Sequence, residues 1–193
     1  MLRRYRLALG LWICGVIMLF VAFISASIVR RGIPAYESGA RAYSTQWEAL
    51  PLPIPLLILD SCMLVVGCFA LELARRRSAG ASLQQPAPKS PSWWIYSAIA
   101  LNLAFLAGQT MVWRLLKAHG ISISTNARIS FYYALTGTYA VQIAIGLLAL
   151  TWIVARQANW TAMERYIAID LATWYFGAMT ALWIVVFCFL VFA

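Results

Sequence analysis

Charged residues are scarce in this sequence, and acidic residues are scarcer still. Only 11% of the 193 residues are charged, and just six residues are aspartate or glutamate. An ordinary soluble domain carries about 25% charged residues, because a chain of this length needs polar surface to cover its core. The composition therefore excludes an ordinary soluble domain and indicates a chain whose apolar surface faces lipid.

Histidine and paired cysteines, which commonly hold metals and heme, are equally scarce. His119 is the single histidine, and it follows the third of the long apolar runs. One histidine cannot supply the axial pair of a low-spin heme or a copper site. The four cysteines form no CxxC pair and are typical of buried small hydrophobic residues. We therefore expect no catalytic residue and no heme or metal in this chain.

Long apolar runs are what the sequence has in abundance, since 63% of its residues are apolar. Five runs each reach the roughly 20 residues needed to cross a bilayer. Continuous apolar runs of this length are typical of helices, because barrel strands are shorter and alternate in polarity. The sequence therefore predicts an all-α integral membrane bundle that forms a single domain over 1–193. The predicted helices cover about 5–29, 52–74, 93–116, 129–155 and 167–192, and a cytoplasmic linker covers 75–92.

The first apolar run begins as a signal peptide does, with three arginines among its first six residues. The run continues to about Val29, which is longer than a typical signal core, and two arginines then stop it. No Ala-x-Ala signature closes it convincingly. We expect this segment to be a retained transmembrane helix.

Basic residues are distributed unevenly about the predicted helices. Nine of the fifteen lie at the N-terminus or in the connections 75–92 and 156–167, and six lie on the opposite side. The positive-inside rule therefore predicts a cytoplasmic N-terminus and a periplasmic C-terminus. Topology and contact with anionic lipid explain the net charge of +9, so we expect no nucleic-acid partner.

Three arginines at helix ends are candidates for contact with lipid headgroups. Arg75 and Arg76 belong to the strongest basic anchor, and Glu72 precedes them at helical spacing, which favours ion pairing at the membrane interface. Arg114 ends the third predicted helix, where binding of a lipid phosphate and simple snorkelling explain it equally well.

Asp60 lies about nine residues into the second predicted helix, which is roughly 13 Å from the helix start. An acid at that depth is costly unless it faces protein or is protonated. We favour a hydrogen-bonded residue that fixes helix packing. The alternative is a proton-linked or partner-binding acid.

Neutral polar residues and glycines inside the predicted helices indicate where helices meet. Gln109 in the third helix and Gln142 in the fourth are suited to hydrogen bonds between helices. Gly137 and Gly146 would allow a neighbouring helix to approach closely. We expect these residues and Asp60 to contact other helices of this chain or a neighbouring subunit.

Two stretches together carry a resemblance to a known family. Phe105–Gln109 with Trp113–Arg114 closes one apolar run, and Phe131–Gly137 followed by Gly146–Leu147 opens the next. The pair resembles subunit III of the heme-copper respiratory oxidases, the family of cytochrome c oxidase subunit III, in its five-helix bacterial form. Weaker matches follow in the right order on the other three helices.

The sequence departs from the family pattern at its ionisable positions. Tyr139 and Gln142 stand where the family usually carries paired histidines, and Val112 stands where it usually carries a glutamate. Asp60 replaces an asparagine, and Gly15 occupies the position of another glutamate. These departures argue against a direct proton-relay role but leave a packing role intact.

The resemblance implies a non-catalytic subunit that packs on the catalytic subunit I, beside subunit II, and holds phospholipid. It implies that oxygen is reduced at heme and copper in the partner subunits, in the cytoplasmic (inner) membrane of a bacterium. One alternative is an accessory subunit of another membrane redox complex, such as nitric oxide reductase. The other is a small independent transporter, although we find no internal repeat typical of one.

Overall fold

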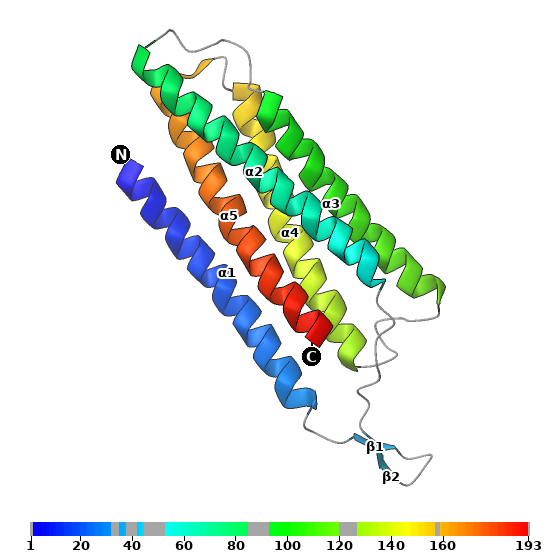
Figure 1. Ribbon diagram of the computed structural model, residues 1–193. Helices are drawn as coiled ribbons and strands as arrows, with labels where there is room; N and C mark the ends of the chain where they lie inside the picture. Colours follow the sequence, from blue (N-terminus) through cyan, green and yellow to red (C-terminus); the bar gives the residue numbers. More distant parts are fainter. Residues whose placement is uncertain are drawn as a thin grey trace.

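The computed structural model describes residues 2–31, 35–37, 42–44, 53–84, 93–119, 127–156 and 159–192. Five long α-helices dominate this part of the chain: α1 (Leu2–Arg31), α2 (Ile54–Gln84), α3 (Trp93–Ala118), α4 (Ala127–Arg156) and α5 (Ala162–Phe192) (Figure 1). Each contains a stretch that is long and apolar enough to span a membrane. For the described residues, the predicted helical fold with five helices long and apolar enough to span a membrane is confirmed.

The helices extend beyond the apolar runs that predicted them, most of all at the end of α2. The predicted linker over 75–92 begins with helix, because α2 continues to Gln84. Residues 75–84 contain alanine, arginine, leucine and glutamine, which favour helix, and no proline interrupts them. Helical propensity therefore carries α2 past the end of its apolar run. The rest of the predicted linker, 85–92, lies outside the described residues.

Two short strands lie in the connection between α1 and α2. β1 (Ala35–Glu37) pairs with β2 (Ala42–Ser44) in an antiparallel hairpin, with Ala35 opposite Ser44. No strand is predicted from the sequence between the first two helices, because three-residue strands are too short to show a clear alternation of polarity.

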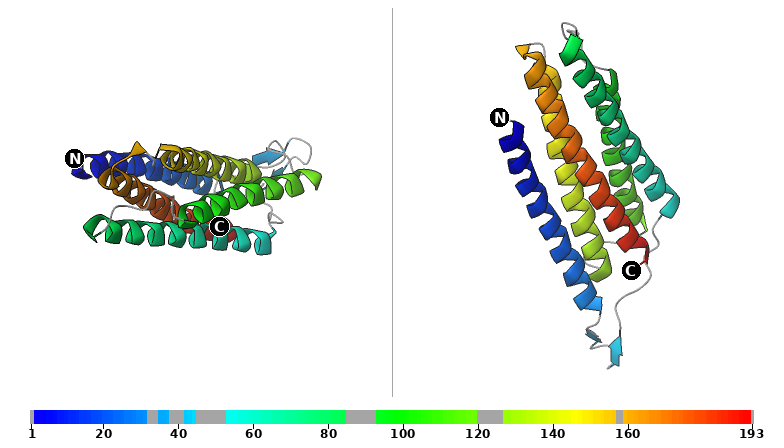
Figure 2. Two further views of the ribbon diagram at one scale, coloured as in Figure 1. Left: turned by 90° about the horizontal axis from the view of Figure 1, so that it is seen from above. Right: turned by 60° about the vertical axis from the view of Figure 1, so that its left-hand side comes forward.

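Consecutive helices run in opposite directions, so the two termini lie at opposite ends of the bundle (Figure 1). α2 packs against α3 and α5, and α4 packs against the same two helices. α1 lies along the outer edge, beside α5 and α4 (Figure 2). Only 11% of its most apolar stretch is buried, against 33–39% in the other helices. The main bundle is therefore α2–α5, and α1 is the helix most exposed to its surroundings.

Four aromatic side chains from four helices form the centre of the core. Phe20, Phe105, Tyr139 and Trp183 are each 0% exposed. The Tyr139 and Trp183 ring centroids lie 4.6 Å apart, and Phe105 packs edge-on against Trp183 at 5.1 Å. The Tyr139 hydroxyl donates a hydrogen bond to the Met179 carbonyl oxygen over 3.1 Å. Tyr139 stands where the resembled family usually carries a histidine. It is thus a core residue whose hydroxyl group has a hydrogen-bond partner.

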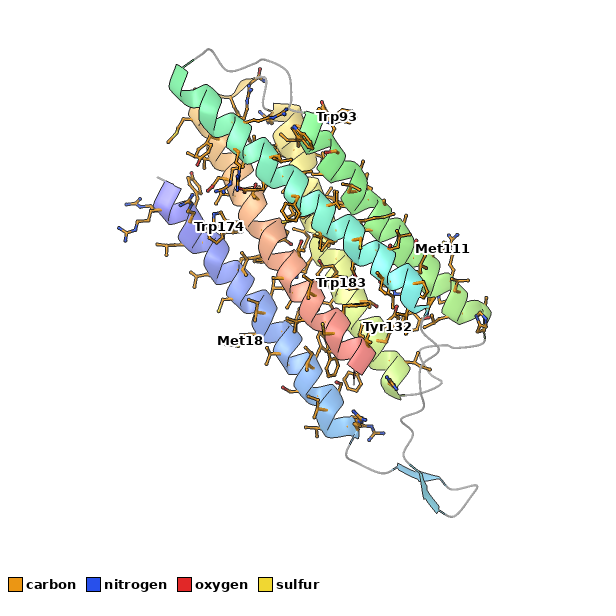
Figure 3. All side chains as sticks on the ribbon, in the orientation of Figure 1. Met18, Trp93, Met111, Tyr132, Trp174 and Trp183 are labelled. Atoms are coloured by element: carbon orange, nitrogen blue, oxygen red, sulfur yellow. The ribbon has the colours of Figure 1, made fainter. Side chains whose placement is uncertain are left out.

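The outer surface of the bundle is apolar over most of its length. Met18 on α1, Met111 on α3 and Trp174 on α5 are 65%, 55% and 56% exposed, and Figure 3 labels all three. Side chains of this kind suit a hydrocarbon environment, where backbone polar groups must be satisfied within each helix.

Candidate functional site: two buried carboxylates between the helices

Asp60 lies at a tight junction between α2 and α3. Asp60 is 2% exposed, and the Gln109 side-chain amide donates a hydrogen bond to Asp60 Oδ2 over 3.1 Å. The carboxyl group rests against the α3 backbone at Gly108, where an added Cβ would come within 2.6 Å of Asp60 Cγ. No side chain fits at position 108 without displacing the carboxyl group. Two of the predicted packing residues, Asp60 and Gln109, therefore meet directly.

The next residue in α2 connects the same turn to α5. Trp183 Nε1 donates to Ser61 Oγ over 2.9 Å, and Ser61 Oγ donates in turn to the Leu57 carbonyl oxygen over 2.8 Å. The indole N–H of a fully buried tryptophan thus has a partner, as burial of a polar group requires. The turn of α2 that carries Asp60 is therefore bonded to both α3 and α5.

The predicted contacts of α4 divide into two kinds. At Gly146 an added Cβ would lie 2.7 Å from Tyr175 Cε1 and 2.8 Å from Phe176 Cζ, so this glycine allows α5 to approach. The Tyr175 hydroxyl donates to the Gln142 carbonyl oxygen over 2.7 Å. At Gly137 an added Cβ would meet none of the described residues within 4 Å. Gly137 is therefore not a close contact within the described chain, and its contact with another subunit stays a prediction.

A second buried carboxylate, which the sequence analysis missed, joins three helices. Asp170 on α5 is 0% exposed. Arg6 on α1 donates to its Oδ2 through Nη2 at 2.8 Å and Nε at 3.0 Å. Arg75 on α2 donates to its Oδ1 over 3.3 Å. Asp170 thus joins α5 to α1 and α2, at the end of the bundle where α1 begins.

The sequence offered a signal for this site that depends on where the last helix begins. A helix predicted from 167 puts Asp170 in its first turn, where an acid is ordinary. The helix in fact begins at Ala162, which puts Asp170 two turns inside. At that depth an acid requires a partner, and Arg6 and Arg75 supply it.

Arg75 continues the ion-pair cluster along α2. Its guanidinium group also pairs with Glu72, with both nitrogen–oxygen distances at 2.8 Å, and Arg76 Nε pairs with Glu72 Oε1 at 2.8 Å. The Arg75 side chain is 30% exposed and the Arg76 side chain 74% exposed. Arg75 therefore bridges the carboxylates of Glu72 and Asp170. Contact of Arg75, Arg76 or the exposed Arg114 with lipid headgroups stays a prediction.

An apolar groove of about 530 Å³ runs along the bundle between α2 and α5. Glu72 and Arg75 line it together with Cys68, Phe69 and Trp174. The groove is therefore apolar along most of its length and is flanked by the paired charges of α2.

Within the described residues, no three histidine, cysteine, aspartate or glutamate side chains gather where they could hold a metal ion. His119 is exposed in the turn after α3, and its Nδ1 lies 2.7 Å from the Leu115 carbonyl oxygen. Asp60 and Asp170 are each bonded to side chains of other helices.

No known protein-family model matches the chain. The chain is 26% identical over 143 residues to proteins of Mycobacterium bovis and Mycobacterium tuberculosis, each named probable cytochrome c oxidase subunit 3. The likeness is a distant one. The matched stretch covers 73% of this chain and 64% of each relative, so the chain spans less than two thirds of the length of the relatives that it matches. The names of these relatives agree with the resemblance carried by the α3 and α4 sequences.

Proposed function

We propose that this chain is a non-catalytic accessory subunit, equivalent to subunit III, of a bacterial heme-copper terminal oxidase. The observation that carries the proposal is the likeness to proteins named probable cytochrome c oxidase subunit 3 over 73% of the chain. Five helices long and apolar enough to span a membrane support the same role. In this role the chain packs on subunit I in the inner membrane, with its N-terminus in the cytoplasm.

The polar contacts support a structural contribution to the complex. Asp60 and Asp170 each join helices through side-chain partners on neighbouring elements. Neither carboxylate is part of a cluster that could bind metal among the described residues. On this proposal, heme, copper and the reduction of oxygen belong to the partner subunits, and this chain supplies a stable surface for them.

Phospholipid is the second partner in the proposal. The groove between α2 and α5 is apolar, as an acyl chain requires, and the exposed Arg76 lies at the same end of α2 as Glu72 and Arg75. A lipid phosphate near Arg76 would gain a charge-assisted contact. Native mass spectrometry should show phospholipid retained by the wild type and less of it on an R76L variant. Equal retention would count against this headgroup contact.

Purification from the native cells tests the subunit assignment. A tagged chain, extracted in mild detergent, should bring down heme-bearing subunits, a Soret band and oxygen consumption driven by cytochrome c or quinol. Nitric oxide consumption without oxygen consumption would favour an accessory subunit of a nitric oxide reductase. A monodisperse chain with no partner, together with solute uptake in vesicles, would instead support a transporter and contradict the proposal.

A further inference from the structure

The junction around Asp60 contains more polar groups than its hydrogen bonds use. Gln109 and Tyr132 are each 1% exposed. Gln109 Oε1 and the Tyr132 hydroxyl make no hydrogen bond to any described residue. Asp60 receives one hydrogen bond, on Oδ2, from the described side chains. Because buried polar groups in proteins are nearly always paired, these two atoms require a partner.

The three residues come from three helices and lie within about one helical turn of a shared buried cluster. Tyr132 on α4 packs in a buried cluster with Leu57 and Val112. Leu57 lies about one turn before Asp60 on α2, and Val112 lies about one turn after Gln109 on α3. Figure 3 shows Tyr132 on α4 near the beginning of α2.

The unused hydrogen-bonding capacity has a definite composition. The tyrosine hydroxyl supplies a donor, while the glutamine oxygen and the second carboxyl oxygen supply acceptors. A water molecule offers two donors and accepts through its lone pairs, so one water complements this set. Buried waters typically make about three hydrogen bonds to groups of this kind.

We propose that Asp60, Gln109 and Tyr132 bind one internal water molecule that joins α2, α3 and α4. The water accepts from the Tyr132 hydroxyl and donates to Gln109 Oε1 and Asp60 Oδ1. The direct bond between Gln109 and Asp60 then forms one edge of a closed hydrogen-bond ring. This site lies inside a single chain, so the inference does not depend on which complex the chain belongs to.

A structure of the purified complex at a resolution of roughly 2 Å, where ordered waters are seen, decides the matter. Density for one water within hydrogen-bond distance of all three side chains is expected. A direct bond from the Tyr132 hydroxyl to Gln109 or Asp60, with no water between them, would overturn the proposal. So would a well-resolved junction in which the three polar groups point apart.

A double-mutant cycle on the thermal unfolding midpoint provides a second measurement. Y132F and Q109M should each lower the midpoint, and the double variant should lose clearly less than the two losses added together, because both changes remove the same water. Y133F is the matched control, since the Tyr133 hydroxyl contacts the Trp113 carbonyl oxygen at 3.4 Å. Its effect should add to that of Q109M. Additive losses for Y132F and Q109M would contradict the shared water.

Discussion

Removing Arg6 and Arg75 together should destabilise the fold far more than removing either one. Asp170 is 0% exposed and pairs with both arginines, at 2.8 Å and 3.3 Å. In R6L or R75L the remaining arginine still neutralises the carboxylate, so each change should cost on the order of 1 kcal/mol. In the double variant the buried charge has lost both arginines, and the cost should rise to about 3–5 kcal/mol.

The assay is thermal unfolding in one detergent, followed by the intrinsic fluorescence of the tryptophans. For a chain of this size, the double variant should lose roughly 6–20 °C. Adding D170N to the double variant removes the buried charge and should recover most of the lost unfolding midpoint. R4L is the matched control, because Arg4 is an exposed arginine in the same turn of α1, and it should leave the midpoint nearly unchanged.

Two results would refute this reasoning. If R6L/R75L unfolds at the wild-type midpoint, Asp170 does not depend on these arginines. If D170N fails to restore the double variant, the loss comes from the packing of the arginine side chains and not from an unpaired charge. Equal losses for R4L and R6L would show that net charge at the N-terminus, rather than the pair with Asp170, is responsible.

Three further predictions follow from the positions of other residues. G146L should destabilise the isolated chain by about 1–3 kcal/mol or more through overpacking. G137L should leave the unfolding midpoint of the isolated chain unchanged and weaken only assembly, which the subunit ratio after purification measures. D60N should leave assembly and proton pumping in vesicles near normal. D60L should weaken assembly, because the Gln109 amide would lose its partner at a cost of about 1–3 kcal/mol. Loss of pumping in an assembled D60N complex would identify Asp60 as a proton relay instead. Reporter fusions at residues 85 and 193 should report opposite sides of the membrane, with 85 inside, and the same side for both would break the five-helix topology.

Much of the fold could be predicted from the sequence because the membrane makes it a local problem. A run of about 20 apolar residues must satisfy its own backbone in lipid, and a helix does so without help from distant residues. The ends were less predictable, because propensity carries α2 to Gln84 and a hairpin forms between β1 and β2 beyond the apolar runs. Apolar length therefore determined how many helices there are, but not where each one ends.

The candidate site could be predicted only in part. The depth of Asp60 indicated a partner, and the deep glutamine at position 109 was among the expected helix contacts. That the two meet beside Gly108 depends on how α2 lies against α3. Gly137 and Gly146 look alike in the sequence, and only the position of α5 distinguishes them, because Tyr175 and Phe176 pack against Gly146 alone.

The ion pairs of Asp170 required the tertiary structure most of all. Its partners Arg6 and Arg75 are 164 and 95 residues away in the sequence, and no local pattern links residues at such separations. By itself, the sequence determined that this chain forms helices long and apolar enough to span a membrane, with few ionisable side chains, because both properties follow from composition and run length. The tertiary structure alone decided which of those few charges meet, because lipid leaves each buried charge to find its partner on another helix.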